Sequence, residues 1–236
     1  MTDVMSLPSA FTLDNIKNVF HDMKYPATFL NTLIATVIGT LGIIVIASMG
    51  GYKMARVKTR YSRFCFLFCI APMMIPFQSF MLTLVNVATT LHINGKIWGL
   101  AIIYWGLGAP MSIFLYQGFA KGIPLELEES ALIDGCNQFQ LFTRIIFPML
   151  KSCTATVTII NVMWIWNDFL LPLLMLGGRK SSKTLQLAAY SFMGQYKMEW
   201  QNIMSAAILI IIPALILYLI FQKSIIKGVV AGAVKG

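Results

Sequence analysis

Five long apolar runs divide this chain and constrain its fold more than any other feature. They lie near residues 29–50, 65–88, 98–119, 150–174 and 203–221. A helix of about 20 apolar residues crosses a hydrocarbon layer of about 30 Å, so each run predicts a membrane-spanning helix. Charged residues make up only 11% of the chain, against about 25% in typical soluble domains. The predicted fold is therefore all-α, a polytopic membrane helix bundle with five spans.

Glycine and proline interrupt two of these runs. The second run contains Pro72 and Pro76, and the third contains Gly106, Gly108 and Pro110. Proline removes a backbone donor, so we expect kinked helices whose freed carbonyl groups face protein or water instead of lipid. Such breaks suit a translocation path, and they are equally typical of plain bundle helices.

The basic residues predict which loops face the cytoplasm. The formal net charge is +9, but Lys and Arg sit mainly in short segments beside the apolar runs, so topology explains them without nucleic acid. The segment KMARVKTRYSR follows the first run with five basic residues and no acid, which predicts a cytoplasmic loop. One outside loop argues against this orientation with Arg179, Lys180, Lys183 and Lys197. We give the first loop the greater weight.

This orientation divides the chain into three parts. We expect an outer N-terminal segment 1–28, a membrane domain 29–221 with a cytoplasmic loop at about 121–148, and a cytoplasmic tail 222–236. An outer segment that precedes the first span needs some means of crossing the membrane. We therefore expect a further helix upstream, with N-out insertion without a leader as the alternative.

The cytoplasmic loop concentrates acid in a chain that otherwise has little. Four of the nine carboxylates lie at Glu126, Glu128, Glu129 and Asp134. Proline followed by Glu favours a helix N-terminus, and Gly135 suits a helix end or hinge. Beyond this glycine, apolar residues recur at helical spacing. The pattern predicts two short helices with a bend between them.

The charge of this loop bears on what it contacts. A helix pair that lies on an anionic membrane surface favours Lys and Arg on its polar face, whereas the first half of this loop is acidic. We therefore interpret the loop as a protrusion that seats in the groove of a partner protein. An amphipathic pair on the inner membrane surface remains the alternative.

Motifs for catalysis are missing from the sequence. The segment GGRKSSK lacks the second glycine of a phosphate loop, so ATP is expected to bind elsewhere. His21 and His92 are far apart, and Cys65 and Cys69 have no partners for a closed zinc site. We predict no metal site, no catalytic residue and no cofactor in this chain, and no enzyme activity.

The loop PLELEESALIDGCNQFQLFTRIIFPML resembles the signature loop of the membrane subunits of binding-protein-dependent ABC importers. That loop carries a Glu-Ala-Ala triplet, then Asp-Gly, apolar anchors and a closing proline. The matching residues here are Glu129, Ser130 and Ala131, then Asp134 and Gly135, then Phe142 and Ile145, and finally Pro148. The resemblance implies a coupling helix that seats in a cleft of an ATPase subunit. Ser130 and Cys136 stand where the family commonly has Ala, and Ser152 where it often has Pro.

The resemblance extends from about Phe11 to Gly236, and segments such as WIWNDFLLPLL and TLQLAAYSFMGQY point to the carbohydrate-uptake branch that includes the second maltose-transporter membrane subunit. It implies a prokaryotic cell membrane protein in a sugar importer. The implied partners are two ATPase subunits that hold ATP and Mg²⁺, a related second permease forming a heterodimer, and an extracytoplasmic sugar-binding protein. Family members usually have six spans, so the resemblance also implies that the first span is missing here.

The resemblance assigns roles within the loop. Gly135 would allow the bend, Phe139 and Phe142 would anchor by burial, and Glu129 and Asp134 would make polar or capping contacts. Polar and aromatic residues at span depth are candidates for the sugar path: Asn31, Gln78, Asn86, Tyr104, Asn161, Trp166 and Asn167. Each is equally able to serve as an interhelical hydrogen-bonding residue.

Two other functions stay open at this point. A secondary transporter normally places an ionisable coupling residue near mid-membrane, but Asp168 is the one acid at a span margin and lies near its end. A membrane scaffold that recruits a soluble partner would explain the acidic loop, but not the broken, amide-bearing spans.

Overall fold

The computed structural model of this chain describes residues 13–177, 182–193 and 199–233. Within these ranges the chain forms helices joined by short connections and contains no β-strand, which confirms the predicted all-α class. Arg179, Lys180 and Lys197, which entered the topology prediction, lie outside the described residues.

Four helices are long, and the others are short. The elements in chain order are α1 (Asp14–Asp22), α2 (Tyr25–Arg56), α3 (Arg60–Ile70), η1 (Ala71–Met74), η2 (Phe77–Ser79), α4 (Met81–Thr90), α5 (Ile97–Lys121), α6 (Leu125–Ile133), α7 (Gln138–Gln140), η3 (Leu141–Ile146), α8 (Phe147–Met149), α9 (Lys151–Asn167), α10 (Leu170–Leu176), α11 (Leu185–Ala189), η4 (Tyr190–Phe192) and α12 (Trp200–Ala233). Element η3 is a π-helix, and η1, η2 and η4 are 3₁₀ helices.

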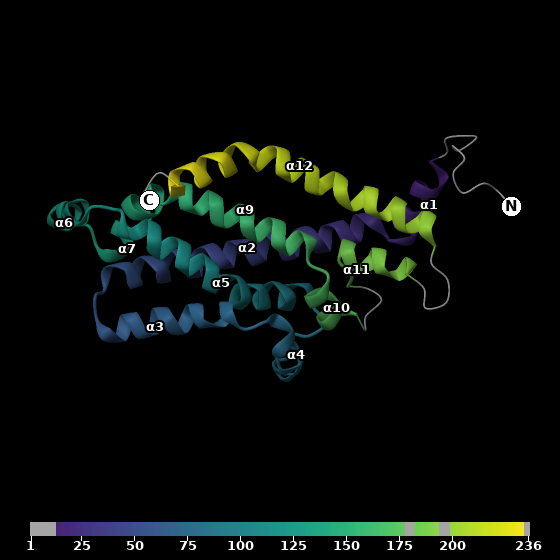
Figure 1. Cartoon of the computed structure of the whole chain (residues 1–236), viewed down its shortest axis with the longest axis horizontal. Helices are drawn as coiled ribbons and strands as arrows, with labels where there is room; N and C mark the ends of the chain where they lie inside the picture. The colour runs from purple at the N-terminus through teal and green to yellow at the C-terminus, as the bar shows by residue number, and fades with distance from the viewer. Residues whose placement is uncertain (1–12, 178–181, 194–198, 234–236) are drawn as a thin grey trace.

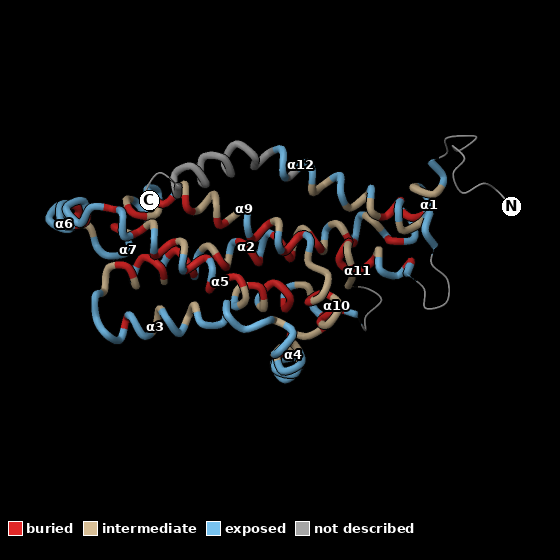
Figure 2. Tube along the Cα trace, in the orientation of Figure 1, coloured by how far each residue is buried: buried red, intermediate tan, exposed pale blue. Residues whose placement is uncertain are grey.

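Helix α2 runs through the length of the bundle (Figure 1). Its most extensive partner is α5, and α9 contacts α2, α5 and α12. Helices α6 and α7 lie at one end of the bundle, whereas α1, α10 and α11 lie toward the other (Figure 1). Buried residues concentrate on α2, α5 and α9, and the outer helix α3 and the projecting α4 and α6 are largely exposed (Figure 2).

Small residues let α2 and α5 approach closely. A Cβ atom added at Gly51 would lie 2.7 Å from Cβ of Tyr116 and 2.9 Å from the backbone nitrogen of Gln117. One added at Gly108 would lie 2.4 Å from Cδ1 of Ile43. Between helices in lipid, close packing of this kind replaces the hydrophobic driving force that operates in water. The sequence of α2 therefore fits its central position.

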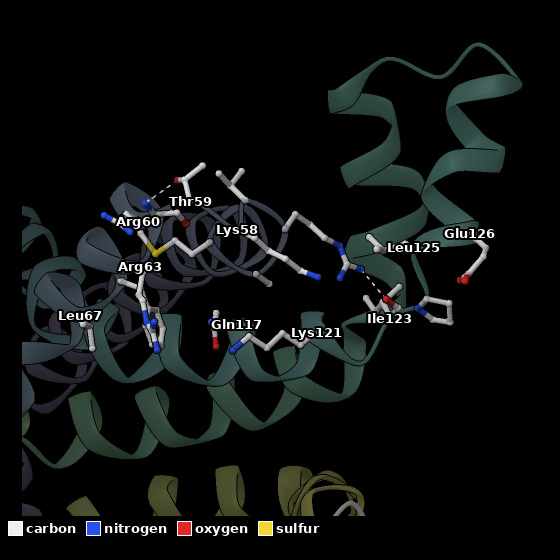
Figure 3. A pocket seen from close by; sticks show the side chains of 17 residues that line it. Lys58, Thr59, Arg60, Arg63, Leu67, Gln117, Lys121, Ile123, Leu125 and Glu126 are labelled. Atoms are coloured by element: carbon white, nitrogen blue, oxygen red, sulfur yellow. Dashed lines mark hydrogen bonds between the residues drawn. The ribbon is translucent and has the colours of Figure 1, made fainter.

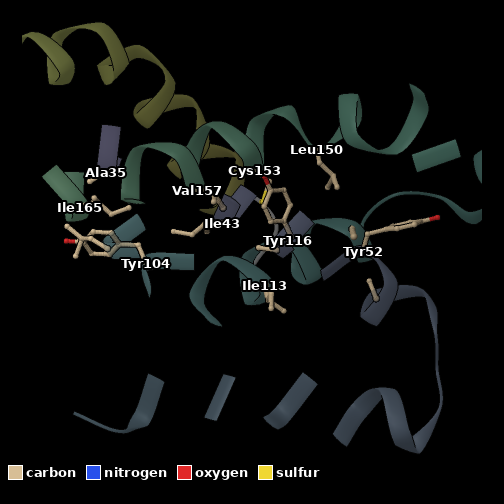
Figure 4. Packing of buried hydrophobic residues seen from close by; sticks show 14 of the residues in the cluster. Ala35, Ile43, Tyr52, Tyr104, Ile113, Tyr116, Leu150, Cys153, Val157 and Ile165 are labelled. Carbon is tan, nitrogen blue, oxygen red and sulfur yellow. The ribbon is translucent and has the colours of Figure 1, made fainter. Parts of the chain in front are cut away.

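Two apolar clusters fill the bundle. The larger joins α2, α5 and α9 and contains Ile43, Tyr104, Tyr116 and Val157 (Figure 4). The smaller surrounds Trp166 and joins α1, α11 and α12. Together they hold the two ends of the bundle in one packed unit.

The predicted spans differ in how well the helices match them. By length and composition, α2 and α5 are able to cross a membrane, and the pair Gln138–Met149 and Lys151–Asn167, bent by 75°, adds a third if it forms one span. The run 98–119 lies in one continuous helix, with Pro110 inside it. The run 150–174 is divided, because α9 ends at Asn167 and α10 begins at Leu170. The count of five spans stays a prediction.

The run 65–88 does not form one helix. Helix α3 ends at Ile70, two 3₁₀ turns follow, and α4 begins at Met81. The physical reason is proline: the residue before Pro76 is forced out of the helical region, and Ile75 is extended with φ −98° and ψ 121°. The prolines thus interrupt this segment more completely than the expected kink. Helix α12 continues to Ala233, past the predicted start of the tail at 222.

The close approach of α2 and α5 predicts a sharp difference between two glycines. We expect Gly51→Ala to destabilise the protein by about 1–3 kcal/mol, because its methyl group collides with Tyr116 and the α5 backbone. At Gly118, an added Cβ meets nothing within 4 Å, so Gly118→Ala keeps or slightly raises stability through helix propensity. Thermal unfolding in detergent measures both, and equal behaviour of the two variants would contradict the packing described here.

Candidate functional site

The predicted coupling loop forms a compact helical hairpin at one end of the bundle (Figure 1). Pro124 precedes α6, and Glu126 and Glu128 occupy the first turn, where negative charge is favoured. At the other end, Gly135 has φ +83°. The Gly135 and Cys136 amides donate to the carbonyls of Leu132 and Ala131 at 3.1 and 3.0 Å, a Schellman cap. Helix α6 thus ends at Ile133, and Gly135 adopts the left-handed conformation just after the cap residue Asp134, in line with the predicted helix end or hinge at this glycine.

The second half of the hairpin begins with a capping box. The Asn137 side chain accepts from the Gln140 amide at 2.9 Å, and the Gln140 side chain accepts from the Asn137 amide at 3.0 Å. The π-helical segment η3 follows, and π-helical turns occur frequently at functional sites. Near Leu150 the chain turns by 75° into α9. The loop is therefore joined to the bundle through a well-defined elbow.

A buried ion pair ties α6 to the end of α2. Arg56 Nε donates to one oxygen of Glu128, and the two side chains are only 13% and 10% exposed. The Tyr52 hydroxyl donates to the other carboxylate oxygen at 2.8 Å. Arg56 Nη2 also donates to the Ile123 carbonyl at 2.9 Å. We call Tyr52, Arg56 and Glu128 the latch.

The latch was not predicted from the sequence. Glu128 entered the prediction only as one of the clustered acids, and Arg56 only as one of the basic loop residues. The two residues are 72 positions apart, and no local pattern pairs them. A buried carboxylate next to three exposed ones cannot be distinguished by composition alone.

The structure places the predicted partner-binding residues on different surfaces. Those that are exposed are Glu129, Ser130, Asp134, Gly135, Phe139 and Pro148. Ala131 is buried. Phe142 contacts Tyr52 of the same chain, with ring centroids 5.6 Å apart, and Ile145 packs against the larger of the two apolar clusters. Phe139 is 69% exposed, and Ile133, which no sequence motif indicates, is 86% exposed. The most exposed apolar side chains of the hairpin therefore lie at Ile133 and Phe139, and Leu125, Leu127 and Leu132 are exposed to a smaller extent.

Three of the predicted sugar-path residues lie in the packed interior. Tyr104 donates to Asp168 at 2.8 Å, and the Asn161 amide donates to Ser112 Oγ at 3.1 Å and to the Val157 carbonyl at 2.8 Å. Trp166 is 1% exposed, and its indole nitrogen has no hydrogen-bond partner among the residues that the structure describes. In this conformation, Tyr104 and Asn161 join helices.

The other four sugar-path residues are more accessible. The Asn31 amide donates to the Lys183 carbonyl at 3.0 Å, whereas Gln78 and Asn86 are exposed. Asn167 lines a cavity of about 500 Å³ together with Gln186 and Tyr190. Amides and an aromatic ring are suitable groups for a polar, ring-shaped ligand. The structure does not bring the seven residues together into one site.

The described residues contain no set of side chains suited to bind a metal ion. No group of three or more His, Cys, Asp or Glu side chains there is arranged to hold a metal ion.

Removal of one partner of the latch should be costly. We expect Glu128→Ala to destabilise the protein by about 3–5 kcal/mol, because Arg56 stays buried without its counter-charge. The double variant Arg56→Leu/Glu128→Leu should be less destabilised than Glu128→Ala, since no buried charge is left unpaired. Glu129→Ala, at an exposed neighbour, should change stability by no more than about 0.5 kcal/mol. Chemical denaturation in detergent would refute the latch if Glu128→Ala matched Glu129→Ala.

Curated relatives cover nearly the whole chain. It is 39% identical over 234 residues to the probable starch degradation products transport system permease protein AmyC of Thermoanaerobacterium thermosulfurigenes, covering 99% of this chain and 85% of the relative. It is 37% identical to the multiple sugar-binding transport system permease protein MsmG of Streptococcus mutans, covering 100% and 85%. It is 32% identical to the melibiose/raffinose/stachyose import permease protein MelC of Bacillus subtilis, covering 97% and 83%.

A solved structure and a family model agree with these relatives. A bacterial ABC transporter involved in the import of the acidic polysaccharide alginate shares the fold, with a TM-score of 0.77, 21% identity and coverage of 94% of this chain and 83% of that one. The family model of the binding-protein-dependent transport system inner membrane component matches residues 42–230. This chain belongs to the binding-protein-dependent transport system inner membrane component family, and is a membrane permease component of an ABC importer.

Proposed function

We propose that this chain is the permease subunit of an ATP-driven sugar importer, and that the α6 hairpin couples ATP hydrolysis by partner subunits to movement of the bundle. The observation that carries the coupling role is the latch, because it fixes an exposed hairpin to the longest central helix. Relatives named for the transport of starch degradation products, multiple sugars and raffinose-type sugars support a sugar as the cargo. Family membership favours an importer over a secondary transporter or a scaffold.

The proposed complex contains several other chains. Two ATPase subunits hold ATP and Mg²⁺, a second related permease completes the membrane part as a heterodimer, and an extracytoplasmic binding protein delivers the sugar. The exposed apolar faces of α3 and α4 support a protein or lipid neighbour along this side of the bundle. The basic loop after α2 supports an orientation in which α6 and the C-terminus face the cytoplasm.

In the proposed mechanism, movement of the hairpin reaches the bundle through two sets of contacts. ATP binding closes the ATPase pair, and the cleft moves α6 through contacts with Ile133, Phe139 and Glu129. One route passes through the latch to α2, and the other passes through η3 and the elbow to α9. Because α2 and α9 both pack against α5, movement on either route reaches the core of the bundle. The result is a change between inward-open and outward-open arrangements.

The docking step predicts a position-dependent loss of ATPase binding. We expect Ile133→Asp and Glu129→Lys to reduce copurification of the ATPase subunits at least tenfold, since both change exposed α6 side chains without disturbing the bundle. Asp22→Lys makes the same charge reversal as Glu129→Lys at the opposite end and should leave copurification unchanged. Retention of the ATPase by both α6 variants would exclude this hairpin as the docking element.

The coupling step predicts a different defect for the latch. Tyr52→Phe removes one hydrogen bond to Glu128 while it keeps the ring beside Phe142. We expect the ATPase to stay bound but sugar-stimulated hydrolysis to fall about tenfold, because a hydrogen bond to a charged group contributes about 1.5–3 kcal/mol. Tyr218→Phe, at an exposed tyrosine of α12, is the control. Reconstituted complexes measure both, and full stimulation in Tyr52→Phe would place coupling on the elbow alone.

A further inference from the structure

A cavity of about 1100 Å³ opens beside the latch, between the start of α3, the end of α5 and the start of α6 (Figure 3). Four of its basic lining residues form no salt bridge in the described part of the chain: Lys58, Arg60, Arg63 and Lys121. Arg56 also lines the cavity, but its charge is already paired with Glu128 in the latch. Glu126 is the one acid in the lining. The cavity therefore carries an excess of positive charge that the chain itself does not neutralise.

A buried amide side chain also lines this cavity. Gln117 lines it, is 9% exposed, and makes no side-chain hydrogen bond within the described residues. Figure 3 shows Lys121 extending along α5 toward Gln117, while Arg63 extends from α3 toward α5. A polar group at this depth normally has a partner. An anion with several oxygen atoms is able to accept from this amide and from the surrounding cations together.

The α3 side of the cavity carries apolar side chains next to its two arginines. Phe66 and Leu67 line it, and Leu67 shares a helix face with Arg60 and Arg63. Beyond Leu67, Phe64 and Phe68 are stacked with centroids 6.2 Å apart and are 64% and 70% exposed. This apolar strip contributes nothing to the binding of a small soluble anion, whereas the acyl chain of a lipid would pack along it. Basic pockets between transmembrane helices on the cytoplasmic side suit anionic lipid headgroups.

We propose that this cavity binds the phosphate-bearing headgroup of an anionic phospholipid of the inner leaflet, with an acyl chain along α3. The proposal uses the cytoplasmic orientation given above and is independent of the cargo. Lys58, Arg63, Lys121 and Gln117 hold the phosphate, and Arg60 adds charge at the N-terminal turn of α3. Because Pro124, Leu125 and Glu126 form the α6 side of the cavity, the bound lipid contacts the base of the coupling hairpin.

The test is lipid retention by the purified chain in nanodiscs or detergent, measured by native mass spectrometry with phosphatidylglycerol and phosphatidylcholine. We expect selective retention of phosphatidylglycerol. Each basic residue near an anionic lipid surface strengthens binding about fivefold, so Lys58→Gln/Arg63→Gln should reduce its affinity roughly 30-fold. Arg144→Gln/Lys151→Gln removes the same charge from exposed positions outside the cavity and should retain the lipid.

Three results would overturn the proposal. Equal losses in the two double variants would indicate diffuse surface charge, and equal retention of phosphatidylcholine would indicate no headgroup recognition. Binding of inorganic phosphate with the affinity of phosphatidylglycerol would indicate a small-anion site instead of a lipid site. Gln117→Leu, which keeps every charge, provides a second variant and should weaken phosphatidylglycerol binding, because the amide contacts the phosphate; unchanged binding would remove Gln117 from the site. Thermal unfolding in neutral lipid checks that each variant is folded.

Discussion

The close contact of α2 with α5 is the constraint on which the other features depend. Glycine at positions such as 51 and 108 removes the side-chain volume that would separate the helices. In lipid, apolar side chains gain little from leaving one apolar medium for another, so shape and polar contacts decide the arrangement. Once α5 lies against α2, α9 packs on both. The end of α2 is then positioned to meet the hairpin that follows α5.

The latch is a buried charge pair that specifies one arrangement of α6 relative to α2, although desolvation of its charges opposes its formation. Both Glu128 oxygens accept hydrogen bonds, and Arg56 also reaches the Ile123 carbonyl. A buried ion pair contributes modestly to net stability, but the loss of one partner is severe. Its value here is therefore geometric. It sets the position of α6 relative to α2, while the exposed side of α6 remains free to contact another protein.

The sequence predicted the helical class, the acidic hairpin and the end of its first helix next to Gly135, because these follow from apolar run length, local charge and glycine geometry. It predicted a kink in the 65–88 run from its prolines but not the full break between α3 and α4, because the apolar run length suggested one continuous span whereas Ile75 before Pro76 is held in the extended region. Phe142, which the resemblance assigned to a partner, also contacts Tyr52 within the chain, with ring centroids 5.6 Å apart. Pairings such as Arg56 with Glu128 depend on tertiary structure, which a single sequence pattern does not encode. The roles of the loop and sugar-path residues remain predictions.

The elbow near Leu150 determines what kind of movement the hairpin is able to produce. Because the segment before it meets α9 at 75°, a displacement along the axis of that segment is directed almost wholly across α9 and hardly along it. A displacement of the hairpin along that segment thus becomes a sideways movement of α9. A helix that swings needs only side-chain repacking at its neighbours, whereas one that slides must break and re-form every ridge-and-groove contact along its length. In the proposed coupling mechanism, the bend therefore favours tilting of α9 as the movement that opens and closes the bundle.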